Sequence, residues 1–503
     1  MQRIGTGLLL VACALLSACA EAPSDAIRMG VASAPITLDP RYATDATSAR
    51  LNRLLYAQLV DFDASARPVA ALAQWQQLAP TRYRFRLDPA RASFHDGSAL
   101  TAADVKATYD SVRDPTNDSP HRSSLEMIER IVVIDEHTVD FELSRPDPLF
   151  PGYLVIGVLP RKGIEAGHPF DRRPWGSGAF ELAAWPVEGL LRLERRADGQ
   201  LFEFLHVSDS TVRVLKLLRG ELDLVQNDLP PELVRYLERQ PHIDVRHREG
   251  GNFSYVGFNL EDPILADLRV RRAIAHAIDR RVIAWHLLGG ETRLAAGLLP
   301  PEHWAGVDFD AYRYDPARAR SLLAEAGYGA GSPLRLNYRT TSDPLRLRIA
   351  TVIQRQLHDV GIQVELSSFD WATFYADIKA GRFQLYSLSW VGIKSPDIFR
   401  YVFHSTSVPP AGANRGRFQD ALVDGLIEAA ETAQEPARRA RLYQELQKRL
   451  LETLPFVPLW YEGQFVAART DIHGYELSAD GDYDSLAQVQ RRPAGVREAR
   501  FAP

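Results

Sequence analysis

The residue types that most often carry catalysis or bind metals form no recognisable motif in this chain. It contains 13 histidines, and a pair that comes close in sequence, His242 and His247, lacks a third ligand at a spacing that suits zinc. No HExxH, GxSxG, P-loop or GxGxxG sequence occurs. Carboxylates are plentiful, and a pair of them can converge in a fold without leaving a signature in the sequence. The sequence therefore favours binding over catalysis, and we expect no metal site and no cofactor.

The two cysteines, Cys13 and Cys19, both lie in a segment typical of an export signal. Arg3 precedes an apolar run over residues 8–16, which is too short to span a bilayer comfortably. The end of this segment, LSAC at 16–19, resembles the lipobox of bacterial lipoproteins, in which the cysteine is acylated and begins the mature chain. Each buried methylene of an acyl chain contributes about 0.8 kcal/mol, so a multiply acylated Cys19 would hold the protein firmly on a membrane.

Removal of Cys13 and lipidation of Cys19 would leave the mature chain without a free thiol. We therefore expect no disulfide, no cysteine nucleophile and no thiolate metal site. Residues 1–19 are expected to be a lipoprotein signal peptide and residues 20–25 a tether. The predicted location is the periplasm or the cell surface, with the palmitate-type anchor of Cys19 in a membrane.

The composition is that of an ordinary globular protein with two or three domains. Hydrophobic residues make up 46% and charged residues 24% of the 503 residues. The net charge of -5 offers no basic surface for nucleic acid, and beyond the signal no apolar stretch is long enough to cross a membrane. We expect a monomer.

Strands and helices alternate along the chain, which favours an α/β fold. A Ser48 cap predicts a helix over 48–60, and a capping box of Thr101 and Asp104 predicts one over 101–113. Further helices are predicted over 211–219, 267–289, 315–328, 344–360, 372–380 and 420–451. Strands are predicted over 27–32, 83–87, 334–338, 363–366 and 456–461, with strand pairs over 132–143 and 178–193.

Several segments, in this order and at these separations, resemble the family 5 extracellular solute-binding proteins, the peptide/nickel class that serves ABC importers. Any one of them is weak evidence by itself, but together they cover nearly the whole mature chain. They are LDP at 38–40, LYAQLV at 55–60, FHDG at 94–97, LTAADV at 100–105, WGSGAF at 175–180, YVGFN at 255–259, DLRVRRAIAHAID at 267–279 and YDP at 314–316, followed by AGY at 326–328. Most of these residues are expected to be scaffolding; for example, Asp267 and Arg271 would form a local pair or hold their helix against a neighbouring strand.

The resemblance implies an α/β fold of the periplasmic-binding-protein type II kind, with two lobes, an inserted extra domain and a ligand cleft between the lobes. Lobe one would comprise residues 26–47, 174–257 and 464–503, the inserted domain 48–173, and lobe two 258–463. Two crossing strands would join the lobes, with hinges near 255–259 and 460–463.

The resemblance also implies where ligand would bind. The segment from Trp390 to Asp397 corresponds to a family loop in which an acid soon after the tryptophan anchors a peptide's amine. Here Ile393 or Lys394 stands at that place, and Lys394 would favour a carboxylate or phosphate on the ligand. Trp390 offers a flat apolar wall. The other candidate ligand-binding residues are Tyr255, Asn259, Tyr461, Trp371, Arg339, Trp175 and Arg415.

These features predict a non-enzymatic, lipid-anchored substrate-binding protein that delivers a peptide or peptide-like solute to an ABC permease and ATPase complex. A sugar, an opine-like compound or a chelated metal is the alternative ligand within the same fold. A lipoprotein sensor or chaperone that uses the same cleft is the alternative of a different class.

Overall fold

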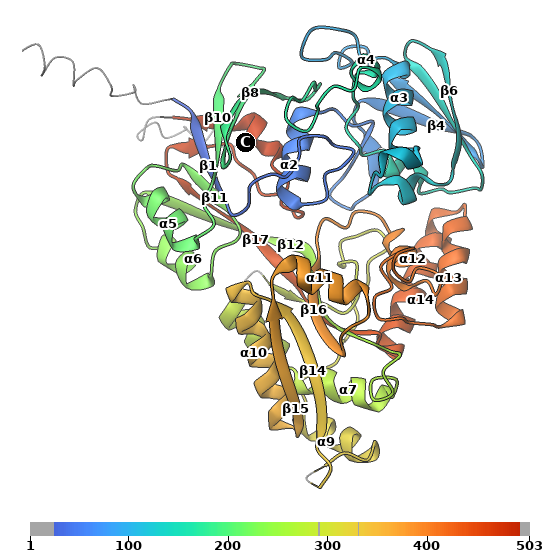
Figure 1. Cartoon of the computed structure of the whole chain (residues 1–503), viewed down its shortest axis with the longest axis vertical. Coiled ribbons are helices and arrows are strands. Elements are labelled where there is room, and N and C mark those ends of the chain that lie inside the picture. Colours follow the sequence, from blue (N-terminus) through green and yellow to red (C-terminus); the bar gives the residue numbers. More distant parts are fainter. Residues whose placement is uncertain (1–24, 290–291, 330, 493–503) are drawn as a thin grey trace, which may run out of the picture.

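The computed structural model describes residues 25–289, 292–329 and 331–492 (Figure 1). The predicted signal peptide, Cys19 and the tether up to residue 24 lie outside these residues. Within them, no helix has both the length and the apolar character needed to cross a bilayer.

The centre of the molecule is a long mixed sheet. Its strand order is β15-β14-β16-β12-β17-β11-β1-β10-β9-β8, and β13 pairs with β17 beside this path. The strands are β1 (Ile27–Val31), β8 (Phe180–Val187), β9 (Leu190–Arg195), β10 (Leu201–His206), β11 (Leu224–Gln226), β12 (Ile243–Phe258), β13 (Arg293–Leu294), β14 (Leu334–Thr341), β15 (Ile362–Phe369), β16 (Leu385–Trp390) and β17 (Phe456–Arg469).

Two long antiparallel strands, β12 and β17, connect the upper and lower halves of this sheet (Figure 1). Their pairing runs from Ile243 opposite Arg469 to Gly257 opposite Phe456, with register shifts between Arg248 and Asn252 and between Ser254 and Tyr255. Bulges of this kind bend a strand.

β17 was predicted only up to residue 461, but it continues into the upper half because its second part pairs with β11.

A second sheet stands apart from the first. It is antiparallel, in the order β4 (Ala73–Ala79), β5 (Arg82–Leu87), β7 (Thr138–Leu143) and β6 (Ile128–Asp135), and α3 (Ala102–Arg113) packs against it. The predicted capping box is confirmed, because the Asp104 carboxylate accepts hydrogen bonds from the backbone N–H and the hydroxyl of Thr101 at 2.8 and 2.7 Å. This unit has its own hydrophobic core, which includes Phe85, Tyr109 and Phe141. A short hairpin of β2 (Val60–Phe62) and β3 (Pro68–Ala70) precedes it.

The helices cover the faces of the two halves. Around the upper half lie α2 (Ala46–Leu55), α5 (Ser210–Leu218) and α6 (Pro231–Leu237), while α4 (Arg161–Glu165) packs against α3 (Figure 1). Around the lower half lie α7 (Leu268–Ala277), α8 (Arg280–Ile283), α9 (Pro316–Glu325), α10 (Pro344–Asp359), α11 (Trp371–Lys379), α12 (Ile398–Phe403), α13 (Ala421–Thr432) and α14 (Pro436–Thr453).

Three predicted helices differ from the observed ones for local reasons. The helix of 48–60 begins earlier, because Asp45 is its cap and the Ser48 hydroxyl instead accepts the N–H groups of Ile36 and Thr37. The stretch 267–289 breaks at Asp279, which caps a second helix. The stretch 420–451 is two helices, because Pro436 cannot continue the first and starts the second.

The predicted local pair of Asp267 and Arg271 is wrong. Asp267 caps α7 and binds Arg269 at 2.6 Å. Arg271 is buried and donates hydrogen bonds to the backbone carbonyls of Leu454 and Thr453, among others. It therefore fixes α7 to the chain just before β17. This agrees with the other role expected from the sequence, in which the pair holds its helix against a neighbouring strand.

Asp147 should make folding stability depend on pH. Its carboxylate is 4% exposed and accepts hydrogen bonds from the Leu149 N–H and the Tyr153 hydroxyl. Burial raises the pKa of Asp147 to about 6, so the folded state binds this proton more tightly than the unfolded chain. Its contribution to stability is lost as the pH rises from about 4 to about 6, and the loss is about 3 kcal/mol at neutral pH. Asp147→Asn removes this dependence.

We expect Asp147→Asn to stabilise the protein relative to the wild type at pH 7 and to lose this advantage at pH 4.5, in urea unfolding at both pH values. The exposed Asp88→Asn variant is the control. An effect of Asp147→Asn that is equal at both pH values would contradict the prediction.

Candidate ligand-binding site

A small pocket lies where β12, β16 and β17 meet the loop before α13. Its cavity volume is about 30 Å³, which is room for a water molecule or two. Aromatic side chains form most of its wall, and its lining residues are Phe253, Tyr255, Tyr386, Trp390, Val402, Phe403, Ala413, Asn414, Arg415, Gly416, Phe418, Pro455 and Phe456. A ligand the size of a dipeptide would have to displace side chains or lie partly outside this cavity.

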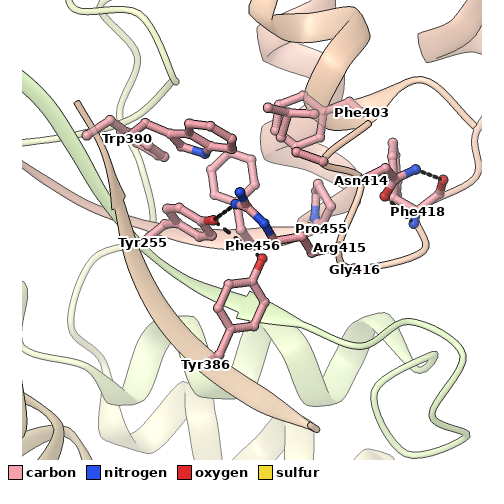
Figure 2. A pocket seen from close by; sticks show the side chains of 13 residues that line it. Tyr255, Tyr386, Trp390, Phe403, Asn414, Arg415, Gly416, Phe418, Pro455 and Phe456 are labelled. Carbon is pink, nitrogen blue, oxygen red and sulfur yellow. Dashed lines mark hydrogen bonds between the residues drawn. The ribbon is translucent and has the colours of Figure 1, made fainter. Parts of the chain in front are cut away.

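Arg415 fills the centre of the pocket (Figure 2). Its guanidinium carbon lies 4.7 Å from the ring centre of Trp390 and 5.3 Å from that of Tyr375. It donates hydrogen bonds to the hydroxyls of Tyr255 at 3.3 Å and Tyr375 at 3.2 Å. The cation is thus held between two aromatic faces, as guanidinium groups favour.

Strand alternation places the tyrosines of the pocket. In β12, Phe253, Tyr255 and Gly257 point to one face, and in β16 so do Tyr386 and Trp390. A side chain at position 257 would meet the Tyr386 ring, because a Cβ there would lie 2.3 Å from it. Gly257 therefore allows Tyr386 to approach Tyr255, with 3.4 Å between their hydroxyl oxygens.

An aromatic surface continues from the pocket to solvent. Trp371 begins α11, is 58% exposed and stacks on Tyr375, with ring centres 5.3 Å apart. On the other side, Trp390 contacts Tyr401, which is 42% exposed. Trp371, Tyr375, Arg415, Trp390 and Tyr401 thus form one continuous row, which can receive the apolar part of a ligand.

Lys394 follows Trp390 by four residues in the chain, but its ammonium already has two carboxylate partners. Its Nζ is 2.7 Å from Asp480 and 3.0 Å from Asp482. Burial would raise the pKa of Asp480, but the charge of Lys394 outweighs it and lowers that pKa. Arg53 of α2 also binds Asp482, at 3.1 Å. A ligand anion would therefore have to compete with protein carboxylates at Lys394.

Asp397 is half-buried directly before α12, and its side chain does not cap that helix. The pKa of Asp397 is raised to about 6, mainly by burial and also by the negative charge of Asp147, while a hydrogen bond from Ser395 opposes the rise. Asp397 therefore lies at the contact between α12 and the segment that holds Asp147.

Four other candidate residues lie outside the pocket. Asn259 donates to the carbonyls of Gly381 and Phe383. The buried Tyr461 hydroxyl lies within hydrogen-bond distance of the carbonyls of Gly297 and Leu299, at 2.7 and 3.0 Å, and donates its one proton between them. The structure does not bring either residue together with Arg415, and their contacts hold loops in place.

Arg339 and Trp175 also have partners of their own. Arg339 pairs with Asp377 and lies over the Phe369 ring. Trp175 packs against Phe94 and His168, between two hydrophobic cores. The structure therefore places Tyr255, Trp390 and Arg415 in one pocket, with Trp371 beside it, and leaves Asn259, Tyr461, Arg339 and Trp175 elsewhere.

Sequence reasoning did not identify Tyr375, Tyr386 or Phe403 as site residues. Tyr386 shares the alternation of β16 with Trp390, and that pattern could have indicated it. Tyr375 lies one helical turn after Trp371, the spacing at which helix side chains meet. Phe403 carries no such signal, because α12 reaches the pocket only through the tertiary fold.

No cluster of three or more histidine, cysteine, aspartate or glutamate side chains that could hold a metal occurs among the described residues. His247, one of the pair considered above, binds Glu238 at 2.9 Å.

Comparison with known proteins identifies the family. Residues 66–409 match the family described as bacterial extracellular solute-binding proteins, family 5 Middle. Di/tripeptide-binding protein 2 of Pseudomonas aeruginosa is 30% identical over 94% of this chain and 96% of its own.

Two solved structures share the fold. The dipeptide-binding protein of Pseudoalteromonas sp. SM9913 in complex with Met-Leu is 24% identical with a TM-score of 0.81, and the match covers 93% of this chain and all of that one. NikZ of Campylobacter jejuni in complex with Ni(L-His) is 22% identical, with the same TM-score and coverage. The expected type II periplasmic-binding-protein fold is confirmed. The chain therefore belongs to family 5 of the bacterial extracellular solute-binding proteins.

Proposed function

We propose that this protein is the substrate-binding component of an ABC importer and captures short peptides outside the inner membrane. It acts as a monomer, by binding rather than catalysis, and delivers its ligand to a permease and ATPase complex. The observation that carries the proposal is the aromatic pocket around Arg415, which lies directly on the two strands that join the halves of the molecule. The similarity to a di/tripeptide-binding protein supports peptide as the ligand class.

The two halves would act as lobes. Lobe one comprises residues 26–47, 174–257 and 464–503, lobe two 258–463, and the inserted domain 48–173. A ligand that contacts both lobes stabilises the closed state, and only this differential binding can drive closure. The permease would then recognise the closed form.

Polar contacts between these units support a closed arrangement. Lys394 of lobe two binds Asp480 and Asp482 of lobe one. Arg348 in α10 binds Glu232 in α6 at 3.1 Å. These ion pairs are available only while the lobes are together, so they would add to the stability of the closed state.

A chelated metal is the second candidate ligand. NikZ, which shares this fold, binds nickel together with histidine. The described part of this chain offers no cluster of metal ligands, so a metal would have to arrive with its own chelator.

The first test is native mass spectrometry of the chain from Ala20 on, purified from its own host without refolding. We expect a ladder of added masses that fit short peptides. A single mass that fits no peptide, or a metal adduct, would contradict peptide capture.

Lys394→Met should loosen the closed state. The substitution keeps most of the length of the side chain but leaves Asp480 without its lysine partner and Asp482 with Arg53 alone. We therefore expect ligand binding to weaken roughly tenfold and the unliganded protein to expand in small-angle X-ray scattering. Lys448→Met on the exposed face of α14 is the control. Unchanged affinity and size for Lys394→Met would exclude a closing role.

We also propose that acylated Cys19 anchors the protein to a membrane at the periplasmic face or the cell surface. Cys19→Ser should move the protein from the detergent phase to the aqueous phase in a detergent partition and abolish palmitate labelling. Cys13→Ser should leave both unchanged. Equal partition of Cys19→Ser and wild type would contradict lipidation.

A further inference from the structure

We propose that Arg415 binds a carboxylate of the ligand. The part of the solute that contacts lobe two would then carry an acidic group, with an apolar group next to it. This inference rests on the proposed function, since it names the chemical class of solute that enters the same pocket. The proposal is limited to the part of the ligand that contacts lobe two.

Arg415 is a buried cation that forms no ion pair with any carboxylate of the described residues. It is 6% exposed, and in the described parts of the chain its hydrogen-bond partners are the phenol hydroxyls of Tyr255, Tyr375 and Tyr386. Burying an unpaired charge costs several kcal/mol, so a protein retains one only where something else compensates it. A ligand anion supplies that compensation.

Other buried arginines of lobe two differ from Arg415. Arg271 donates four hydrogen bonds to backbone carbonyls, and Arg280 donates three. Those guanidinium groups are satisfied by the fold itself and serve structure. Arg415, by contrast, has neutral phenol hydroxyls rather than carbonyls or carboxylates as its hydrogen-bond partners in the described residues, and it lies beside the cavity.

The surroundings of Arg415 suit a planar oxyanion. Trp390 and Tyr375 lie against the guanidinium and leave its N–H groups for hydrogen bonding in the plane, the geometry that binds a carboxylate with two parallel bonds. Tyrosine hydroxyls both accept and donate. While Tyr255 and Tyr375 accept from Arg415, their own protons can be donated to the same carboxylate.

The neighbouring charges disfavour a ligand amine at this place. The loop after Trp390 carries Lys394 and has no acid before Asp397. The acids nearest to Lys394, Asp480 and Asp482, are engaged by Lys394 and Arg53. A positive group in the pocket would thus meet the unpaired charge of Arg415.

The test compares Met-Leu with its C-terminal amide by isothermal titration calorimetry. Because a hydrogen-bonded charge contributes more than a neutral pair, we expect wild type to bind the acid at least about tenfold more tightly than the amide. Arg415→Gln should bring this ratio close to one. Arg417→Gln, in the same loop, should leave the ratio unchanged.

The melting temperature without ligand separates a binding role from a structural one. Arg415→Gln removes an uncompensated buried charge, so the unliganded variant should melt no lower than wild type, whereas a structural arginine would lower the melting temperature when replaced. If Arg415→Gln does not fold, Arg415→Lys keeps the charge without the paired N–H groups and should show a reduced acid preference.

Each outcome decides the proposal. Equal binding of acid and amide by wild type would overturn it while peptide capture stands. If neither binds, peptide capture fails, and N-acetylleucine is then compared with N-acetylleucinamide in a thermal shift assay. A rise in melting temperature with the acid alone, in wild type but not in Arg415→Gln, supports the carboxylate site, and no such rise overturns it.

Discussion

The pairing of β12 with β17 is the constraint on which the rest of the structure depends. These strands are 16 and 14 residues long and run through both halves of the central sheet. Their backbones approach closely at the bulge, where a Cβ at Gly250 would lie 2.0 Å from the carbonyl oxygen of Glu462. The same ladder carries Phe253, Tyr255 and Phe456 into the pocket. A change in the relative position of the halves is therefore transmitted directly to the walls of the binding site.

Charge is distributed unequally around this ladder. Glu462 in β17 accepts hydrogen bonds from both terminal nitrogens of Arg346 and from Ser389, so this half-buried acid at the junction is paired. In the pocket on the same ladder, Arg415 lies among aromatic rings and phenol hydroxyls, and no ion pair of its guanidinium occurs among the described residues. A paired charge such as Glu462 stabilises the fold, whereas an unpaired buried charge such as Arg415 indicates a ligand-binding role. Burial and pairing together make this distinction, and residue type alone does not.

The sequence predicts the local elements well because their signals are local. Asp315 caps α9 and Thr101 with Asp104 begins α3 as expected, since caps act over a few residues. The breaks at Asp279 and Pro436 carried signals of the same kind that a long apolar pattern concealed.

The binding site was only partly predictable because its contacts are distant in sequence. The family resemblance indicated Trp390 and Tyr255, and Arg415 was a candidate as an arginine in a loop. That Tyr375 and Tyr386 bind them depends on how β12, β16 and α11 pack. The partners of Lys394 lie more than eighty residues later, at Asp480 and Asp482. No spacing rule reaches that far, so an apparent ligand-binding lysine is engaged within the protein.

Ligand-dependent closure is tested most directly by the distance between two spin labels, one at Tyr236 in α6 and one at Arg355 in α10. The chain from Ala20 on contains no cysteine, so two introduced cysteines carry the only labels. In pulsed electron spin resonance with Met-Leu, the account predicts one short, narrow distance distribution, and without ligand a longer and broader one. Identical distributions with and without bound ligand would contradict closure of the lobes around it.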